Sequence, residues 1–225
     1  VLISVIALLV STAYAGNNDI YITQTGTGLT LTIDQIGATN TVGTSAARAV
    51  VSGTSMTIDI DQIGSSNTIA ASILQGNSSS WTYSNTGSSA AATFAVGATG
   101  DVANSDFDYT ASGGDSNILF WTQGAAATAT GANTDFVISG ASNNINATCE
   151  VVGCVNNWTI SGSSNDIDTS QTNNSDHSIT ATITGDSNNI DVDQSSVGGS
   201  TSDILVITAT TSNGTIDIDQ CASGC

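Results

Sequence analysis

Alternating apolar and polar positions run through most of the chain. In the segment 56–62 the side chains of Met, Ile, Ile and Gln share one side of an extended strand, and those of Thr, Asp and Asp share the other. The segment 188–194 repeats this pattern, with Asn, Ile, Val and Gln on one side and Asn, Asp and Asp on the other. A period of two predicts strands with one buried face. We therefore expect an all-β protein whose aliphatic side chains point inward and whose Asp, Ser and Thr side chains point outward.

These strands belong to an internal repeat with the pattern Gly-x-x-Asn-x-apolar. Successive asparagines of its six copies are 27, 50, 26, 22 and 23 residues apart, so that the gap of 50 corresponds to two units, one of them degenerate. A shifted seventh copy is Asn213-Gly214-Thr215-Ile216. We expect the repeat glycines to form the turns between two strands, because glycine adopts positive φ freely and the following Ser and Asn bond their own backbone. These glycines are Gly37, Gly64, Gly114, Gly140, Gly162 and Gly185.

One strand-turn-strand unit is too small to bury its apolar face in water. Stacked units bury a continuous aliphatic column and pair each strand with neighbours above and below. The sequence therefore predicts a β-solenoid of stacked strand-turn-strand repeats of about 22–27 residues, extending over residues 16–225. The segment 75–112 fits the pattern poorly, and we expect it to be either a degenerate coil or an exposed loop.

Amide side chains recur at inward positions of the repeat. A buried amide is costly unless its donors and acceptors are satisfied, and an in-register column of amides satisfies them along the stack at about 4.8 Å per unit. The chain contains no proline, which would break such a ladder. The expected ladder residues are Gln35, Asn40, Gln62, Asn67, Asn117, Gln123, Asn143, Asn165, Gln171, Asn188, Gln194 and Gln220.

With these residues the repeat resembles the curlin repeat, the unit of curli-type amyloid fibre subunits. That pattern is Gln-x-Gly-x-x-Asn-x-small or apolar, closed by a Gln six residues after the Asn; segments 35–42 and 62–69 match its first part. Later copies depart from it, since Ile138, Ile160 and Ile183 replace the first Gln and Cys149 takes a closing-Gln position. The resemblance covers most of residues 18–220. It implies a secreted structural protein that forms or decorates an extracellular, amyloid-like fibre with an adhesive or scaffolding role, or alternatively a rigid fibre component of a phage or virus particle.

The ends of a stacked solenoid carry unpaired strand edges, which template pairing with another chain. The first coil offers Leu29, Leu31, Ile33 and Gln35, and the last offers Ile216, Ile218 and Gln220. Acidic residues on both coils repel one another unless salt screens them. We expect self-association end to end into filaments at physiological or marine ionic strength.

Residues 1–15 form an apolar run that ends in Ala13-Tyr14-Ala15, the small-x-small pattern of a signal-peptidase site. The run is shorter than a membrane span, which needs about 20 apolar residues. We therefore expect a signal peptide. No basic segment and no initiator Met precede the run, so we expect this signal peptide to be truncated at its start. The mature chain is expected to begin at Gly16, to be secreted to the cell surface or beyond, and to lack a membrane span. The alternative is a buried first strand.

Four cysteines form two local pairs, Cys149 with Cys154 and Cys221 with Cys225. In an exported chain an even number of cysteines indicates disulfides, here two short staples. Pairing between the two clusters and free thiols in a reducing compartment are the alternatives. A zinc site needs closer Cys-x-x-Cys spacing or histidine partners, and the chain has a single histidine.

Charge excludes some classes of partner. Lys plus Arg totals 1 and Asp plus Glu totals 19, so the chain lacks the cations that bind nucleic-acid phosphates. The carboxylate pair Asp59 and Asp61 imitates a glycosidase dyad, but the repeat produces such pairs in copy after copy, and general bases are scarce. We expect no enzymatic activity. The outward Asp residues would suit Ca²⁺, yet no calcium-binding loop occurs, and a solvated acidic face is the simpler interpretation.

Thr-x-Thr runs offer a second alternative to the fibre function, in which a flat face of the solenoid binds another surface. Such runs, at 30–32 and 180–182, would align hydroxyl groups for binding ice or another flat surface. They do not recur at one place in every coil of the sequence pattern, which disfavours this function relative to a fibre.

Overall fold

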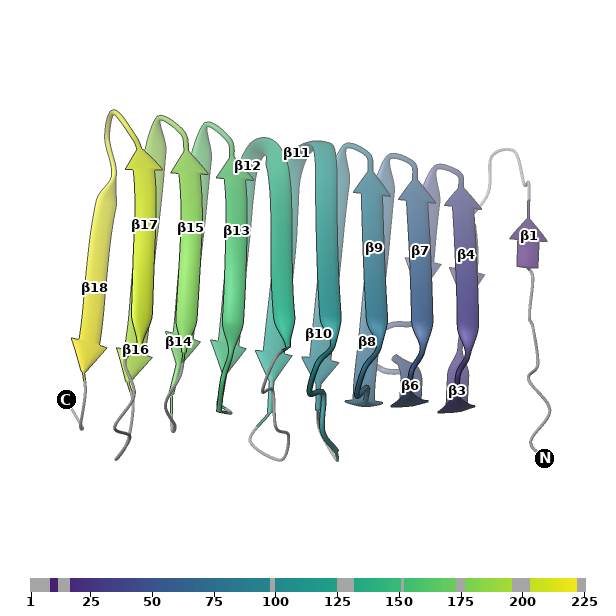
Figure 1. Ribbon diagram of the computed structural model, residues 1–225. Helices are drawn as coiled ribbons and strands as arrows, with labels where there is room; N and C mark the ends of the chain where they lie inside the picture. The colour runs from purple at the N-terminus through teal and green to yellow at the C-terminus, as the bar shows by residue number, and fades with distance from the viewer. Residues whose placement is uncertain are drawn as a thin grey trace.

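The computed structural model describes residues 9–11, 17–97, 100–124, 132–150, 152–172, 177–195 and 203–221. These residues form β-strands and connecting turns, and none of them belongs to a helix with the length and hydropathy that crossing a bilayer requires. Each pair of neighbouring strands is parallel, and the chain winds as a β-solenoid (Figure 1). The predicted all-β solenoid is confirmed.

The strand before the turn in each coil is its first arm, and the first arms stack into one face of the solenoid. This first-arm face lies toward the viewer in Figure 1. It contains β4 (Thr30–Ile36), β7 (Thr57–Ile63), β9 (Ser80–Thr86), the first halves of β11 (Asp106–Gln123) and β12 (Asn133–Cys149), β13 (Val155–Ser161), β15 (Ser178–Thr184) and β17 (Ile204–Thr210). A short strand, β1 (Leu9–Ser11), pairs with β4.

The strands after the turns form the opposite face, the second-arm face. It contains β2 (Asn17–Ile20) with β3 (Thr23–Thr27), β5 (Thr39–Val42) with β6 (Ala49–Thr54), β8 (Ser66–Gln75), β10 (Ser89–Val96), the second halves of β11 and β12, β14 (Ser164–Gln171), β16 (Ser187–Ser195) and β18 (Thr215–Cys221). The two faces enclose one core in which inward side chains alternate with outward ones. The alternation follows from the period of two in the sequence.

The segment 75–112 contains regular arms. β9 pairs in register with β7 and with the first half of β11, and β10 pairs with β8 and with the second half of β11. The repeat is masked in the sequence because aromatic residues take several aliphatic positions. Trp81, Tyr83 and Phe94 are buried here and begin a chain of ring contacts, with centroids 5.2–6.4 Å apart, that runs to Trp158. Each such contact adds about 0.5–1.5 kcal/mol beyond burial of area.

The turn glycines are required for a reason different from the one expected. None of the six has positive φ; the glycines that do are Gly28, Gly43, Gly97, Gly113 and Gly153. The reason is instead close stacking of backbones, because a Cβ atom at Gly162 would lie 2.2 Å from the carbonyl oxygen of Gly140, and one at Gly185 would lie 2.1 Å from that of Gly162. The expectation of positive φ was wrong, and the glycines mark where successive coils touch.

Candidate functional site: amide columns, acidic surface and open ends

The repeat asparagines form a hydrogen-bonded column through the core. Asn143 Nδ2 donates to Asn165 Oδ1 at 2.7 Å, and Asn165 Nδ2 donates to Asn188 Oδ1 at 2.7 Å. The same bond joins Asn117 to Asn143 at 3.0 Å and Asn40 to Asn67 at 2.8 Å. Each donor lies one coil before its acceptor, so the amide dipoles align along the stack and polarise one another.

The sequence pattern missed the first member of this column. Asn18 of β2 donates to Asn40 Oδ1 at 2.9 Å, as the later asparagines do to theirs. The spacing of 22 residues between Asn18 and Asn40 equals the shortest spacing of the repeat and was the available signal. No glycine precedes Asn18 at the repeat position, which hid it.

Glutamine side chains form two shorter columns with the opposite polarity. On the first arms, Gln62 Nε2 donates back to Gln35 Oε1 at 2.7 Å. On the second arms, Gln194 donates to Gln171 at 3.0 Å, and Gln220 donates to Gln194 at 2.7 Å. Asparagine amides therefore donate toward the C-terminal end of the stack, and glutamine amides donate toward the N-terminal end.

Both kinds of column are interrupted in the coil that contains β10. Ala90 takes the asparagine place and Val96 the closing-glutamine place. Asn67 donates instead to Asn85 of β9, which stands in the first-arm glutamine column. On either side of the interruption, Asn85 Nδ2, Asn117 Oδ1 and Gln123 Nε2 are buried without a hydrogen-bond partner among the described residues. The interruption divides the amide network into an N-terminal and a C-terminal part.

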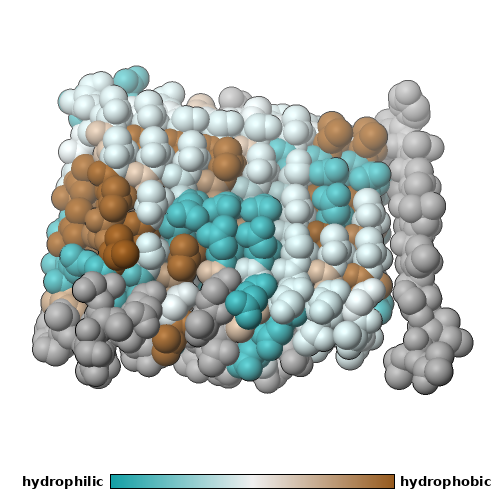
Figure 2. All heavy atoms as spheres, in the orientation of Figure 1, coloured by the Kyte–Doolittle hydropathy of each residue, from teal (hydrophilic) through white to brown (hydrophobic). Residues whose placement is uncertain are grey.

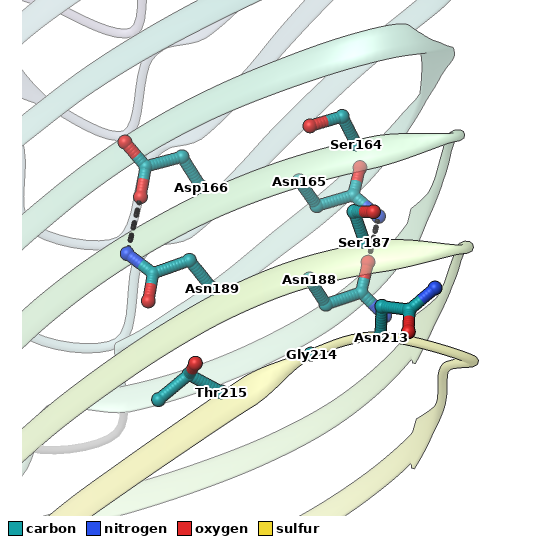
Figure 3. Close-up of a pocket in the computed structure, with 9 residues that line it drawn as sticks. All are labelled: Ser164, Asn165, Asp166, Ser187, Asn188, Asn189, Asn213, Gly214 and Thr215. Atoms are coloured by element: carbon teal, nitrogen blue, oxygen red, sulfur yellow. Dashed lines mark hydrogen bonds between the residues drawn. The ribbon is translucent and has the colours of Figure 1, made fainter.

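The asparagine column ends in a depression near the last coil (Figure 3). Gly214 precedes Thr215, the register partner of Asn189, so it occupies the place in which the next asparagine would lie. A hollow of about 610 Å³ opens there, lined by Ser164, Asn165, Asp166, Ser187, Asn188, Asn189, Asn213, Gly214 and Thr215. The shifted seventh copy of the repeat therefore terminates the column.

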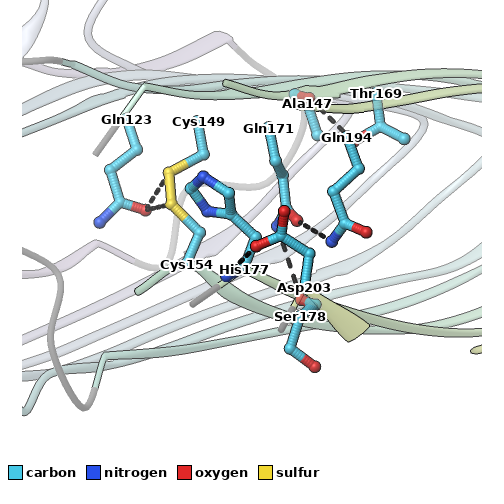
Figure 4. The surroundings of a disulfide bond; sticks show 10 residues. All are labelled: Gln123, Ala147, Cys149, Cys154, Thr169, Gln171, His177, Ser178, Gln194 and Asp203. Carbon is cyan, nitrogen blue, oxygen red and sulfur yellow. Dashed lines mark hydrogen bonds between the residues drawn. A yellow bond between two sulfur atoms is a disulfide. The ribbon is translucent and has the colours of Figure 1, made fainter. Parts of the chain in front are cut away.

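One of the two expected disulfides is present within the described residues. Cys149 at the end of β12 is bonded to Cys154 before β13 and closes a loop of a few residues (Figure 4). Gln123 Oε1 lies 3.7 Å from Cys149 Sγ, which shows that the staple takes the closing-glutamine place in its column. Of the other pair, Cys225 lies outside the described residues.

The outward Asp residues form columns of like charge, as expected. On the second-arm face Asp168, Asp191 and Asp217 are register partners in successive coils. Partial desolvation and the charges of Asp193 and Asp168 raise the pKa of Asp191 above 3.8. On the first-arm face desolvation, Asp61 and Asp34 raise the pKa of Asp59 in the same way. At both sites desolvation and the neighbouring negative charges make ionisation of the carboxyl less favourable than in a free aspartate.

A carboxylate cluster that the sequence did not reveal lies in the middle of the first-arm face. Asp106, Asp108 and Asp135 bring one oxygen each within 4.8 Å of one another. Asn157 Nδ2 donates to Asp135 Oδ1 at 2.8 Å, and Asn133 Nδ2 donates to Asp135 Oδ2 at 2.9 Å. Desolvation and the neighbouring carboxylates raise the pKa of Asp108. Oxygen donors of this kind suit a hard cation such as Ca²⁺. The hydrogen bonds from Asn133 and Asn157 already offset part of the repulsion between the carboxylates.

The ends of the stack are open among the described residues. β2 and β3 pair only with β5 and β6, and β17 and β18 pair only with β15 and β16. Ile216 and Ile218 continue the buried columns of Ile190 and Val192, yet they are 45% and 44% exposed because no further coil covers them. The last rung therefore presents both unpaired backbone groups and apolar side chains.

The comparisons with known proteins return no relative. No protein-family model, no curated protein and no solved structure matches the chain. The function is therefore argued from the site alone.

Proposed function

We propose that this chain is a secreted structural protein whose solenoids join end to end into an extracellular, amyloid-like fibre with a scaffolding role. The observation that carries the proposal is the match between the two ends of the stack. An unpaired strand edge templates another strand. Here the strands at the two ends of the stack carry matching side chains in the same register.

The second arms of the first and last coils belong to the same side-chain columns. The strand register places Ile20, Val42 and, at the other end of the stack, Ile216 in one column of side chains. It also places Gln24, Val51 and, at the other end, Gln220 in a second column. A second copy stacked on β18 in this register therefore places Ile20 on the exposed Ile216 and Gln24 on Gln220.

The polarity of the glutamine columns agrees with a head-to-tail junction. Gln220 Nε2 is already used in its bond to Gln194, and within the described residues no group donates to Gln220 Oε1. Gln24 Nε2 makes only a long contact, 3.5 Å, with the carbonyl oxygen of Thr25. In the junction Gln24 donates to Gln220, which repeats the direction of the bonds within the chain.

The N-terminal strand β1 decides whether the junction closes. β1 pairs with β4 and takes the first-arm place of the coil whose second arm is β2 and β3. With β18 on β2 and β3 of the next copy, β17 meets β1, and both faces continue without a gap; without β1 one first-arm place at the junction is empty. Removal of residues 1–15 as a signal peptide would therefore leave the second arms and their glutamine column to form the junction, while the proposed cleavage site lies outside the described residues.

Assembly is tested by electron microscopy and light scattering of purified residues 16–225 across a salt series. The Ile216→Lys/Ile218→Lys variant places two charges on the terminal rung only, and Ile36→Lys/Ile63→Lys, at exposed positions of the first-arm face, is its matched control. We expect filaments from the parent and the control and none from the terminal variant, all with the same circular dichroism. Equal polymerisation by the terminal variant, or a parent that stays monomeric at high salt and concentration, contradicts the proposal.

A further inference from the structure

Register aligns hydroxyl side chains on the C-terminal half of the first-arm face. Thr182 pairs with Thr159 on one side and with Thr208 on the other. A second column lies two residues further along each of these strands, where Thr184 pairs with Ser161 and with Thr210. Together the array consists of Ser139, Thr159, Ser161, Thr182, Thr184, Thr208 and Thr210, on β12, β13, β15 and β17. Thr-x-Thr runs do not recur at one place in every coil, as expected, since Thr32 pairs with Asp59. On this half, however, coils of unequal length bring hydroxyl runs of three successive coils into register.

The array is exposed and periodic in two directions. Its threonines are exposed, and among the described residues no side-chain hydrogen bond uses their hydroxyl groups. Neighbouring strands set a spacing of about 4.8 Å along the stack, and alternate residues set one of about 6.7 Å along each strand. Stacking keeps such a sheet flatter than an isolated sheet, and β13, β15 and β17 run nearly side by side in Figure 1.

Charge is absent from the outward positions of β13, β15 and β17, and the carboxylate of Asp135 lies on the neighbouring β12. No outward side chain of β13, β15 or β17 is ionisable, although the chain carries a net charge of −18. Acidic outward residues lie instead on the other face and on earlier coils, such as Asp34, Asp61 and Asp108. Figure 2 shows this face, with a hydrophilic cluster near its middle, pale surface beside it and a hydrophobic patch toward the C-terminal end. The hydrophobic residues exposed on β17 are Ile204 and Val206.

We propose that this hydroxyl array binds ice. Hexagonal ice is an uncharged lattice of hydrogen-bonded oxygens whose repeats are comparable with the two spacings of the array. Threonine offers a hydroxyl group to bond lattice water and a methyl group that water surrounds without competing charge. Ionised carboxylates would instead hold strongly oriented hydration water that does not fit the lattice, so their exclusion from β13, β15 and β17 is what the function requires.

Other flat partners fit the array less well. Sugar rings of crystalline polysaccharides pack on exposed aromatic rings, and the outward positions of β13, β15 and β17 carry none. A second copy at this face would cover Ile204 and Val206 but would leave the hydroxyl columns without a function. The array lies on the side of the stack, so end-to-end assembly leaves it exposed and repeats it along a fibre.

The test measures thermal hysteresis and adsorption of the fluorescently labelled chain to a single ice crystal. Thr182→Tyr places a bulky side chain at the centre of the array and keeps strand propensity. Thr57→Tyr makes the same change on β7, at an exposed position of the same face outside the array, and Thr182→Ser keeps the hydroxyl group. We expect the parent, Thr57→Tyr and Thr182→Ser to bind ice and Thr182→Tyr to lose both signals.

Several results would overturn the proposal. They are no hysteresis and no adsorption by the parent, equal loss in Thr57→Tyr, or unchanged binding by Thr182→Tyr. Binding to crystalline cellulose or chitin with no effect on ice, or a side-to-side dimer that Thr182→Tyr dissociates, would assign the array to another partner. Filament formation is measured on the same samples, so failure of ice binding and failure of end-to-end assembly are separate outcomes.

Discussion

Asn165 provides the sharpest test of the amide column. Its side chain is buried; it accepts from Asn143 and donates to Asn188, with both N···O distances at 2.7 Å. Alanine at this position removes both bonds. Asn143 keeps its bond to the carbonyl oxygen of Ser161 at 3.1 Å, whereas Asn188 Oδ1 loses its donor in the column and stays buried.

The expected cost follows from these two losses. A buried acceptor without a donor costs about 1–3 kcal/mol, and the net loss of one further hydrogen bond costs about 1 kcal/mol. We therefore expect Asn165→Ala to lower the free energy of unfolding by about 2–4 kcal/mol. With a urea m value of about 3 kcal/mol/M the midpoint falls by about 1 M.

The matched control is Asn189→Ala on the neighbouring outward position. Asn189 is exposed and donates to Asp166 Oδ1 at 2.8 Å, so its loss should change stability by no more than about 0.5 kcal/mol. Because a solenoid can unfold coil by coil, urea unfolding by circular dichroism is combined with hydrogen exchange, which should lose protection in β12, β14 and β16.

A double-mutant cycle with Asn188→Ala separates the column from local packing. In the double variant Asn188 no longer carries an unsatisfied acceptor, so the two costs should not add, and the coupling should be about 0.5–3 kcal/mol. Additive costs, or an Asn165→Ala variant as stable as Asn189→Ala, would show that the column contributes nothing and would refute the reasoning.

Three further predictions concern the turns, the charges and the staple. Gly162→Ala should destabilise by about 1–3 kcal/mol in urea titrations because its Cβ meets Gly140, whereas Gly26→Ala, whose nearest neighbour atom is 4.0 Å away, should be tolerated. The folded-state pKa of carboxyls such as Asp191 is raised above the usual 3.8, so in acid the folded chain binds more protons than the unfolded chain. The melting temperature at low salt should therefore rise as the pH falls from 7 toward the pKa of these carboxyls. A steady fall in melting temperature would contradict this. The Cys149→Ser/Cys154→Ser variant should lose about 2 kcal/mol, measured by unfolding and by hydrogen exchange near β13.

Much of the fold could be predicted because one short-range rule repeats. A period of two fixes the inward faces, and the Gly-x-x-Asn spacing fixes the coil length, so Asn143, Asn165 and Asn188 were expected in one column and lie in it. The short separation of Cys149 and Cys154 similarly limited the loop they close.

The remaining features depend on register across coils, which the sequence pattern does not contain. Asp106 and Asp135 are 29 residues apart and approach only through the pairing of β11 with β12, which the irregular segment concealed. The hydroxyl array was hidden for the same reason, since Thr159 and Thr182 follow turns of different length. The role of Gly162 depends on the distance between stacked backbones rather than on its own φ.

The central claim is that solenoids join head to tail in the register set by their own columns. Electron cryomicroscopy of filaments grown from residues 16–225 measures it directly through the axial rise per subunit. Nine second arms, from β2 and β3 to β18, stacked at about 4.8 Å predict a rise of about 43 Å, with β18 of one copy paired in parallel with β2 and β3 of the next. Filaments with a different rise, subunits joined through their flat faces, or discrete monomers under all conditions would contradict it.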